Sequence, residues 1–285
     1  MVSPTIWHVR GGRALDPAPF LIFGIVNVTP DSFHDGGQHA EAVTGLAHAV
    51  RLAEEGAHVL DVGGESSRPF ADPVPLAAEL DRVLPVVDGL RGHRGENGLP
   101  WAISVDTYKA ATAAAVLAAG ADIINDISAF SFDPELLDVL GEYQPGYVLM
   151  HSQGKPTEMQ KAPRYADVVE EILDFFEKKL KELVAAGMPE ERIMLDPGIG
   201  FGKTVEHNVA ILKNMHRFAQ FGLPVMAALS NKSMFGGLCG LPVGERATAT
   251  QAATAILAAR GVYAHRVHDV ALTVQTLVVA NALTA

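Results

Sequence analysis

Short apolar runs alternate along the chain with longer segments whose apolar residues recur at helical spacing. The clearest run spans residues 21–26, and a continuous run of this length is typical of a strand in a parallel sheet covered on both faces. Similar runs lie at residues 59–62, 102–105, 122–124, 147–150, 193–195, 224–229 and 263–267. Helical spacing is clear at residues 40–55, 76–90, 109–119 and 165–186. The pattern therefore predicts a repeated strand-then-helix unit.

Eight such units within about 250 residues, with no composition break between them, predict an α/β fold that is a single (β/α)8 TIM barrel. We assign residues 21–285 to this barrel domain. Residues 1–20 contain Trp7 and a Gly11-Gly12 turn, which predict a short N-terminal hairpin or plug packed on the barrel. A doubly wound sheet is the alternative, but no glycine-rich dinucleotide fingerprint supports it.

Composition narrows the class of protein. With 285 residues, of which 48% are hydrophobic, the chain can bury a large core. The formal net charge of -11 argues against nonspecific binding of nucleic acid, because no basic surplus is present to displace counterions. A single cysteine, Cys239, excludes an intramolecular disulfide and fits a reducing cytoplasm. We expect no signal peptide and no membrane span, since no stretch approaches the roughly 20 apolar residues that a span needs.

Polar residues stand at or just after the end of most predicted strands. They are Asn27, Asp106, Asn125, His151, Asp196, Lys232 and His268. Each one alone has an ordinary explanation, because Asp and Asn cap helices and Lys is usually solvated. In a closed barrel, however, the carboxyl ends of the strands converge on one mouth, where barrel enzymes keep their active sites. The recurrence therefore predicts a site at this mouth.

The predicted site holds two kinds of group. Asp106, Asn125, Asp196 and Lys232 form a set suited to a flat ligand with adjacent N–H donors, such as an aminopyrimidinone. The second set suits phosphate oxygens and comprises Asn27, Ser66, Ser67, Arg68, Arg266 and His268. Two alternatives stay open at this point. Asp106 caps the helix that follows it, or Arg266 pairs with Asp269.

The chain resembles the dihydropteroate synthases of folate biosynthesis from about residue 23 to residue 280. The resemblance rests on these blocks, in order: NVTPDSFHDGG, DVGGESSRPFA, ISVDTYKA, IINDIS, LMHSQG, MLDPGIGFGKT, NKSMFGGL and RVHDV. It implies a TIM barrel that condenses 4-aminobenzoate with 6-hydroxymethyl-7,8-dihydropterin diphosphate and releases pyrophosphate. It also implies Mg²⁺ as cofactor, a homodimer and membership of a family that sulfonamides target, with neither nucleic acid nor membrane as partner.

The resemblance also implies roles for individual residues. The family's pterin-binding positions match Asp106, Asn125, Asp196 and Lys232, and its diphosphate and magnesium positions match Asn27, Arg266 and His268, with Asn27 as the metal ligand. Asp106, Asp196, Lys232, Arg266 and His268 are expected to be catalytic. Further substrate contacts are expected from Ser67, Arg68, Met150, Phe201 and Ser233. Two mobile loops are expected, the first with Asp31, Phe33 and Asp35 and the second with Pro69.

The sequence departs from the family pattern at a few positions. Ser67 stands where threonine is usual, Phe70 where glycine is usual, Asn231 where arginine is common and Ser152 where methionine is frequent. Two rival functions remain. One is a methyltransferase-type pterin-binding barrel, which has no use for the RVHDV motif. The other is a catalytically silent relative that only binds pterin, for which Asn231 and Phe70 are the only support.

Overall fold

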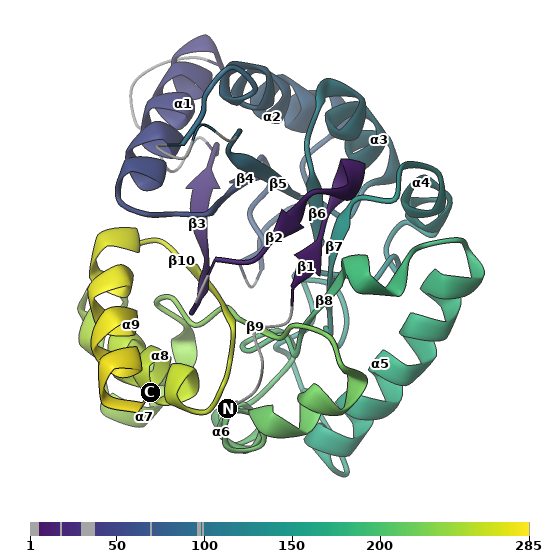
Figure 1. Cartoon of the computed structure of the whole chain (residues 1–285). Helices are drawn as coiled ribbons and strands as arrows, with labels where there is room; N and C mark the ends of the chain where they lie inside the picture. The colour runs from purple at the N-terminus through teal and green to yellow at the C-terminus, as the bar shows by residue number, and fades with distance from the viewer. Residues whose placement is uncertain are drawn as a thin grey trace.

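Eight parallel strands form one sheet in which neighbours along the chain are neighbours in space, in the order β8-β7-β6-β5-β4-β3-β10-β9 (Figure 1). The strands are β3 (Leu21–Asn27), β4 (Val59–Gly63), β5 (Ala102–Asp106), β6 (Ile123–Asp126), β7 (Gly146–Met150), β8 (Ile193–Asp196), β9 (Met226–Ala227) and β10 (Ala264–Val267). A parallel bridge between Leu195 and Val225 joins the two ends of the sheet. The predicted eight-stranded barrel is therefore confirmed.

The structure is a computed structural model that describes residues 6–17, 19–29, 38–68, 70–95, 98 and 100–284 of the chain. The helices surround the sheet (Figure 1). They are α1 (Gln38–Glu54), α2 (Leu76–Leu90), α3 (Ala110–Ala119), α4 (Leu136–Tyr143), α5 (Val168–Ala185), α6 (Val205–Lys213), α7 (Ser233–Cys239), α8 (Ala247–Ala259) and α9 (Val270–Thr284). Short 3-10 helices lie at Arg10–Gly12, Glu190–Arg192, Met215–Phe221 and Val243–Glu245. Within the described ranges, none of the helices has the length and apolarity needed to cross a membrane.

Most predicted boundaries lie within one or two residues of the observed ones. The helix predicted at residues 76–90 coincides with α2, whereas the helix predicted at residues 165–186 begins only at Val168, because the side chain of Asp167 caps it. The largest difference is the seventh barrel strand. Its pattern predicts extended structure throughout residues 224–229, but only Met226–Ala227 forms a strand, in register with β10.

The N-terminal segment forms the expected hairpin. Strands β1 (Trp7–His8) and β2 (Ala14–Leu15) pair antiparallel, and Gly11 allows the turn between them with a φ of +73°. Trp7 is fully buried and shares an apolar cluster with residues near the start of the barrel strands, including Leu21 and Val59. The hairpin therefore closes the N-terminal end of the barrel, and Figure 1 shows it lying across the ring of strands.

A second and larger apolar cluster lies between the strands and the surrounding helices. It is the outward face of the barrel, packed on the apolar stripe of each helix. With apolar packing outside the strands and at their N-terminal ends, the polar strand ends are left for the opposite mouth. The division of the chain into a separate N-terminal extension and a barrel domain stays a prediction.

Candidate active site

The strand ends bring most of the predicted residues to one mouth. Asn27, Asp106 and Asp196 are the last residues of β3, β5 and β8. Asn125 is the third residue of the four-residue strand β6, and it lies beside Asp106 in the sheet register. Their positions follow from the parallel sheet, because its strands all end on the same side. Lys232 lies outside a strand, immediately before α7.

Arg266, on β10, links the two predicted groups directly. Its Nε donates to Oδ2 of Asp61 at 2.6 Å, and its Nη2 donates to Oδ2 of Asp106 at 2.7 Å. The alternative in which Arg266 pairs with Asp269 is therefore wrong. The Asp269 side chain instead accepts the backbone N–H of Leu272 at the start of α9.

Asp61 is the hub of this cluster, and sequence analysis missed it. Its side chain is fully buried in the middle of β4, where it accepts hydrogen bonds from Ser104 and from Nδ2 of Asn125 (3.0 Å) as well as from Arg266. A buried carboxylate must be paired in this way to be tolerated. The detectable signal was a charged residue inside an otherwise apolar strand run. Asp61 fixes the orientation of both Asn125 and Arg266.

Burial shifts the ionisation of the cluster. The pKa of Asp106 is raised to about 7, because burial and the carboxylates of Asp61 and Glu79 disfavour its charged form, while Arg266 opposes the shift. Nor does Asp106 cap the helix that follows it. The backbone N–H of Ala110, the first residue of α3, is bound by Oδ2 of Asp133 at 2.8 Å. Asp106 is therefore left facing the mouth with Arg266.

A glycine-rich loop follows Asp196 and contacts the side chain of Lys232. Oδ1 of Asp196 accepts the N–H of Gly198 at 2.7 Å, and a Cβ atom at Gly198 would lie 1.9 Å from a backbone oxygen, so only glycine fits there. The loop then places the ring of Phe201 under Nζ of Lys232, 4.2 Å from the ring centroid. Burial and the charge of Arg266 lower the pKa of Lys232 to about 8, against the attraction of Asp196.

His151 does not join the mouth as an open group. Its ring is buried one residue after β7, and its Nδ1 lies 2.9 Å from Nζ of Lys203. Burial, reinforced by the positive charge of Lys203, lowers its pKa to about 2. Lys203 itself is buried, with a pKa lowered to about 7 mainly by burial, and it donates to the backbone oxygens of His151 and Phe201. Through the hydrogen bond from Lys203 to the backbone of Phe201, this buried pair stabilises the Phe201 loop. Sequence analysis missed Lys203, for which the chain offered no signal beyond a charge in a glycine-rich segment.

The predicted phosphate-binding group lies around the ends of β10 and β4. The ring Nδ1 of His268 is 2.9 Å from Oγ of Ser230. Although this ring reaches the surface, partial desolvation and the charges of Arg266 and Arg68 lower its pKa to about 4. Ser67 and Arg68 follow β4 in the predicted second loop. Asp31, Phe33, Asp35 and Pro69 lie outside the described residues.

Two predicted site residues remain, Met150 and Ser233. Met150 ends β7 and packs with Phe201 in a small buried apolar cluster, while Ser233 begins α7. Phe70, which stands where the family usually has glycine, has a φ of +67° and is 63% exposed. This left-handed conformation is strained for a residue with a side chain, whereas glycine adopts it freely.

Comparison with known proteins agrees with this geometry. Residues 23–268 match the family described as pterin binding enzyme. The dihydropteroate synthase of Haemophilus influenzae is 41% identical over 261 residues, which cover 92% of this chain and 93% of the relative. The chain belongs to the dihydropteroate synthase family of pterin-binding enzymes.

Solved structures of dihydropteroate synthases share the fold. The Xanthomonas albilineans enzyme with 4-aminobenzoic acid has a TM-score of 0.88 at 41% identity, and the match covers 98% of this chain and 99% of that one. The same organism's enzyme in complex with 7,8-dihydropteroate has a TM-score of 0.84 at 39% identity, covering 97% and 99% of the two chains. The TIM barrel and the family predicted from the sequence are both confirmed.

The residues that the structure describes leave Asn27 as the predicted metal ligand to consider. Among the described residues, no group of three or more His, Cys, Asp and Glu side chains is arranged to hold a metal ion. The predicted ligand, Asn27, offers a single carboxamide oxygen at the end of β3. A lone oxygen ligand of this kind still suits Mg²⁺, which keeps several waters and is commonly completed by substrate phosphates.

Proposed function

We propose that the chain is a dihydropteroate synthase, which condenses 4-aminobenzoate with 6-hydroxymethyl-7,8-dihydropterin diphosphate to give 7,8-dihydropteroate and pyrophosphate. The observation that carries this proposal is the meeting of the pterin-type set with Arg266 at one mouth. Arg266 donates a hydrogen bond to Asp106, and both Arg266 and Asn125 donate to Asp61. A pterin bound there would direct its methylene group towards the phosphate-binding side. The family relationship points to the same reaction.

The pterin ring is held by the strand-end residues. Asp106, Asn125 and Asp196 face its ring N–H and amino groups, and Lys232 donates to a ring carbonyl or nitrogen. Met150 and Phe201 supply apolar surface beside the ring, with Ser233 at the edge of the site. Because Asp106 and Asp196 contact the ring N–H groups, they also stabilise the positive charge that develops on the pterin as pyrophosphate departs.

The diphosphate is held by the second group. Nε and Nη2 of Arg266 are engaged by Asp61 and Asp106, while its Nη1 makes no hydrogen bond to any of the described residues. That nitrogen is available for a diphosphate oxygen. Arg68, Ser67 and His268 complete the set. The negative charge of a bound diphosphate would raise the low pKa of His268 and so favour its protonated ring, in which both ring N–H groups are donors.

Mg²⁺ fits the oxygen donor of Asn27, which would hold it together with diphosphate oxygens and water. When bound, the ion neutralises charge on the leaving diphosphate. The chain's own residues supply the remaining charge at the leaving oxygens. A strong general base is not needed, because the aromatic amine of 4-aminobenzoate is already nucleophilic. Preorganised charges in a site with little water favour departure of pyrophosphate before attack of the amine.

A turnover assay with labelled 4-aminobenzoate tests the proposed function. Formation of labelled dihydropteroate, dependent on the pterin diphosphate, supports the synthase. Methyl transfer to a corrinoid without dihydropteroate would favour the rival methyltransferase reaction. Pterin binding without any turnover would favour the silent relative. Complementation of a strain that lacks its own synthase gives the same answer in cells.

The order of substrate binding is part of this proposal. Ser67 and Arg68 lie in the second loop, which borders the 4-aminobenzoate pocket. Because their contacts with diphosphate oxygens would hold this loop in place, we expect the pocket to form only after the pterin diphosphate binds. Titration of 4-aminobenzoate with and without pyrophosphate and Mg²⁺ tests this order. Tight binding is expected only in their presence. Comparable affinity in both titrations would refute ordered assembly.

A second copy of the chain is the proposed macromolecular partner. Apolar side chains stand exposed on α8 and α9, with Ile256 at 53% and Val278, Val279 and Leu283 at 62%, 57% and 81%. A patch of this kind supports a homodimer. Light scattering on Val279→Lys, with Val243→Lys on the 3-10 helix before α8 as control, is expected to show dissociation only for the first. A wild-type monomer would refute the proposal.

A further inference from the structure

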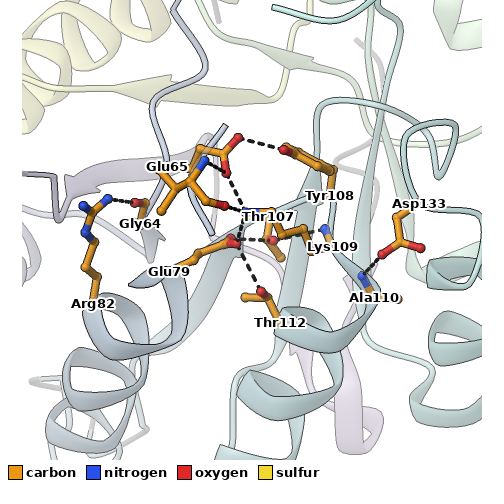
Figure 2. Close-up of polar contacts among 11 residues, drawn as sticks. Gly64, Glu65, Glu79, Arg82, Thr107, Tyr108, Lys109, Ala110, Thr112 and Asp133 are labelled. Atoms are coloured by element: carbon orange, nitrogen blue, oxygen red, sulfur yellow. Dashed lines mark hydrogen bonds and ion pairs between the residues drawn. The ribbon is translucent and has the colours of Figure 1, made fainter. Parts of the chain in front are cut away.

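Hydrogen bonds join the two ends of the second loop, at Glu65 and Val74 (Figure 2). We call these two ends the neck of the loop, and the hydrogen bonds that join them through Lys109 the tie. Oε2 of Glu65 accepts the backbone N–H of Val74 at 3.1 Å and Nζ of Lys109 at 2.6 Å. The same Nζ donates to the backbone oxygen of Val74 at 2.6 Å. One lysine and one glutamate thus join the two ends of the segment at residues 65–74. Lys109 itself lies between β5 and α3, outside this segment.

The tie is anchored to the helix layer by a buried carboxylate. Nζ of Lys109 also donates to Oε2 of Glu79, on α2, at 2.7 Å. Glu79 is 1% exposed, and its two oxygens further accept the hydroxyl groups of Thr107 (2.7 Å) and Thr112 (3.2 Å). All of its oxygens are therefore partnered, as a buried carboxylate requires. The neck of the loop is therefore anchored to α2 and to the segment that directly follows Asp106 at the end of β5.

Tyr108 completes the arrangement. Its hydroxyl donates to Oε1 of Glu65 at 2.8 Å, so both oxygens of Glu65 are engaged (Figure 2). Lys109 lies between two carboxylates that would otherwise repel each other, and although burial opposes the charge, its hydrogen bonds to Glu65 and Glu79 raise its pKa. Lys109 is therefore charged at neutral pH, and the tie is not weakened by titration there.

The neck borders the site. A small cavity between it and the strand ends is lined by Glu65, Ser66, Ser67, Asp106 and Tyr108, together with Glu79, Thr107 and Ile127. Beyond the neck, the N–H of Phe70 donates to the backbone oxygen of Pro156 at 3.0 Å, which docks the far side of the loop on the segment after β7. Ser67 and Arg68 thus lie between two fixed points.

From this geometry we infer that Glu65, Lys109 and Tyr108 are positioning residues that preset the second loop for the second substrate. The inference rests on the proposed function, since Ser67 and Arg68 matter only if they meet diphosphate and border the 4-aminobenzoate pocket. The pterin ring, in contrast, is held by strand ends that do not depend on the loop. Loosening the neck adds conformational freedom that the loop must lose when it closes. The cost therefore falls on the groups that the loop contacts, the diphosphate and 4-aminobenzoate, and not on the pterin ring.

The test uses Tyr108→Phe and Glu65→Gln, which keep side-chain volume. We expect the Michaelis constant for the aminobenzoate substrate to rise about tenfold, as the loss of one hydrogen bond to a charged group implies, and kcat to change less. Hydrogen exchange of the amides at residues 66–74 is expected to accelerate by a similar factor. Binding of 6-hydroxymethylpterin, which lacks the diphosphate, should stay at the wild-type level and shows that the barrel is folded.

Matched controls carry the same chemical changes away from the loop. Tyr263→Phe removes a hydroxyl that donates to Pro17 at the other end of the barrel, and Glu170→Gln breaks an exposed pair with Arg217. Both should leave the Michaelis constant and the exchange rates unchanged. Faster exchange with an unchanged Michaelis constant, or unchanged exchange in both loop variants, would overturn the inference. If the wild type makes no dihydropteroate, the proposed function fails. The exchange measurement is independent of that outcome, because unchanged exchange in the loop variants would still show that Glu65 and Tyr108 do not order the loop.

Discussion

The two ends of the barrel are built from the same strands with opposite chemistry. At the N-terminal end, Trp7 and the first residues of the strands form a closed apolar cluster. At the C-terminal end, Asp61 and Asp106 each lie within hydrogen-bond distance of Arg266. One end is stabilised by burying apolar surface, whereas the other keeps buried charges for a ligand.

This difference shows that stability and function are separated along each strand, with the N-terminal residues packing in the core and the C-terminal residues forming the site. The pKa of Lys232 is lowered and that of Asp106 is raised, mainly by burial in both cases, which means that the folded chain disfavours both charges at the mouth. Such strain is typical of active sites. Substitutions at the mouth are therefore expected to reduce binding, and substitutions at the hairpin to reduce stability.

The largest effect is expected from Arg266→Met. Turnover should fall about 10²–10³-fold, because a preorganised donor to the leaving diphosphate is lost. The free energy of unfolding should also fall by about 3–5 kcal/mol, because Asp61 and Asp106 stay buried without their cation. Steady-state kinetics and urea denaturation measure the two losses.

The double variant Arg266→Met with Asp61→Asn sharpens this prediction. Removing one of the two uncompensated charges should recover part of the stability while turnover stays low. Recovery of turnover together with stability would mean that Arg266 acts only in the fold, and the contrast between the two ends of the barrel would be lost.

Trp7→Ala tests the opposite end. The free energy of unfolding should fall by about 3–5 kcal/mol, as for other large buried aromatic residues, with loss also of the hydrogen bond from its Nε1 to the backbone oxygen of Arg192. Pterin affinity at a temperature where the variant is folded should be that of the wild type. Calorimetric titration beside thermal unfolding gives both numbers. A marked loss of pterin affinity would show that the two ends are coupled.

A smaller effect is expected from Lys232→Met. Pterin affinity should fall about ten- to hundredfold, because a charge-assisted hydrogen bond to a buried ligand is removed. Stability should not fall, since an unfavourably placed cation is replaced by an apolar chain of similar length. Lys213→Met, on the exposed side of α6, is the control. Wild-type affinity in Lys232→Met would refute the pterin assignment.

The pH dependence of the same pair isolates the charge. In the free protein the pKa of Lys232 is about 8, below its ordinary value, so the ammonium donor is present below pH 8 and is lost as pH rises through it. The ratio of wild-type to Lys232→Met affinity should therefore be constant up to about pH 7 and decline towards one above pH 8. Titration of the ligand itself cancels in this ratio. A ratio that stays constant to pH 10 would show that the charge is not used.

The smallest effect is expected from Phe70→Gly at the rim of the mouth. Relief of the positive φ should raise the free energy of unfolding by about 1 kcal/mol or less, because the flexibility of glycine offsets part of the gain. The ratio of a sulfonamide's inhibition constant to the Michaelis constant for the aminobenzoate substrate should change, since the residue stands in the loop beside that pocket. Phe70→Leu keeps the strain and serves as control. An equal ratio in all three proteins would exclude a role for Phe70 in this discrimination.

The barrel and most of the mouth could be predicted from the sequence, because their signals are local. Apolar runs of strand length are visible in the chain, and a polar residue directly after such a run, as at Asp106 or Asp196, must lie at the strand end. The seventh strand was overestimated because residues 224–229 have the composition of a strand, whereas pairing with β10 decides how much of the segment is extended.

His151 shows where this local reasoning ends. Like the mouth residues, it stands at the end of an apolar run in the sequence, yet its ring is buried and its Nδ1 lies beside Nζ of Lys203. The hub Asp61 shows the reverse, since it lies inside a strand and still reaches the site. Strand ends define where a backbone goes, but the direction of a side chain depends on the neighbours that it finds.

By itself, the sequence determined the order of strands and helices, the family and most of the residues that converge on the mouth. Only the tertiary structure decided which charges pair. The partners of Arg266 come from β4 and β5, 205 and 160 positions away along the chain, and Lys109 joins two carboxylates from other elements. The physical reason is that a buried charge must be compensated by whichever group the fold brings within hydrogen-bond distance, and no local pattern of residues encodes that distance.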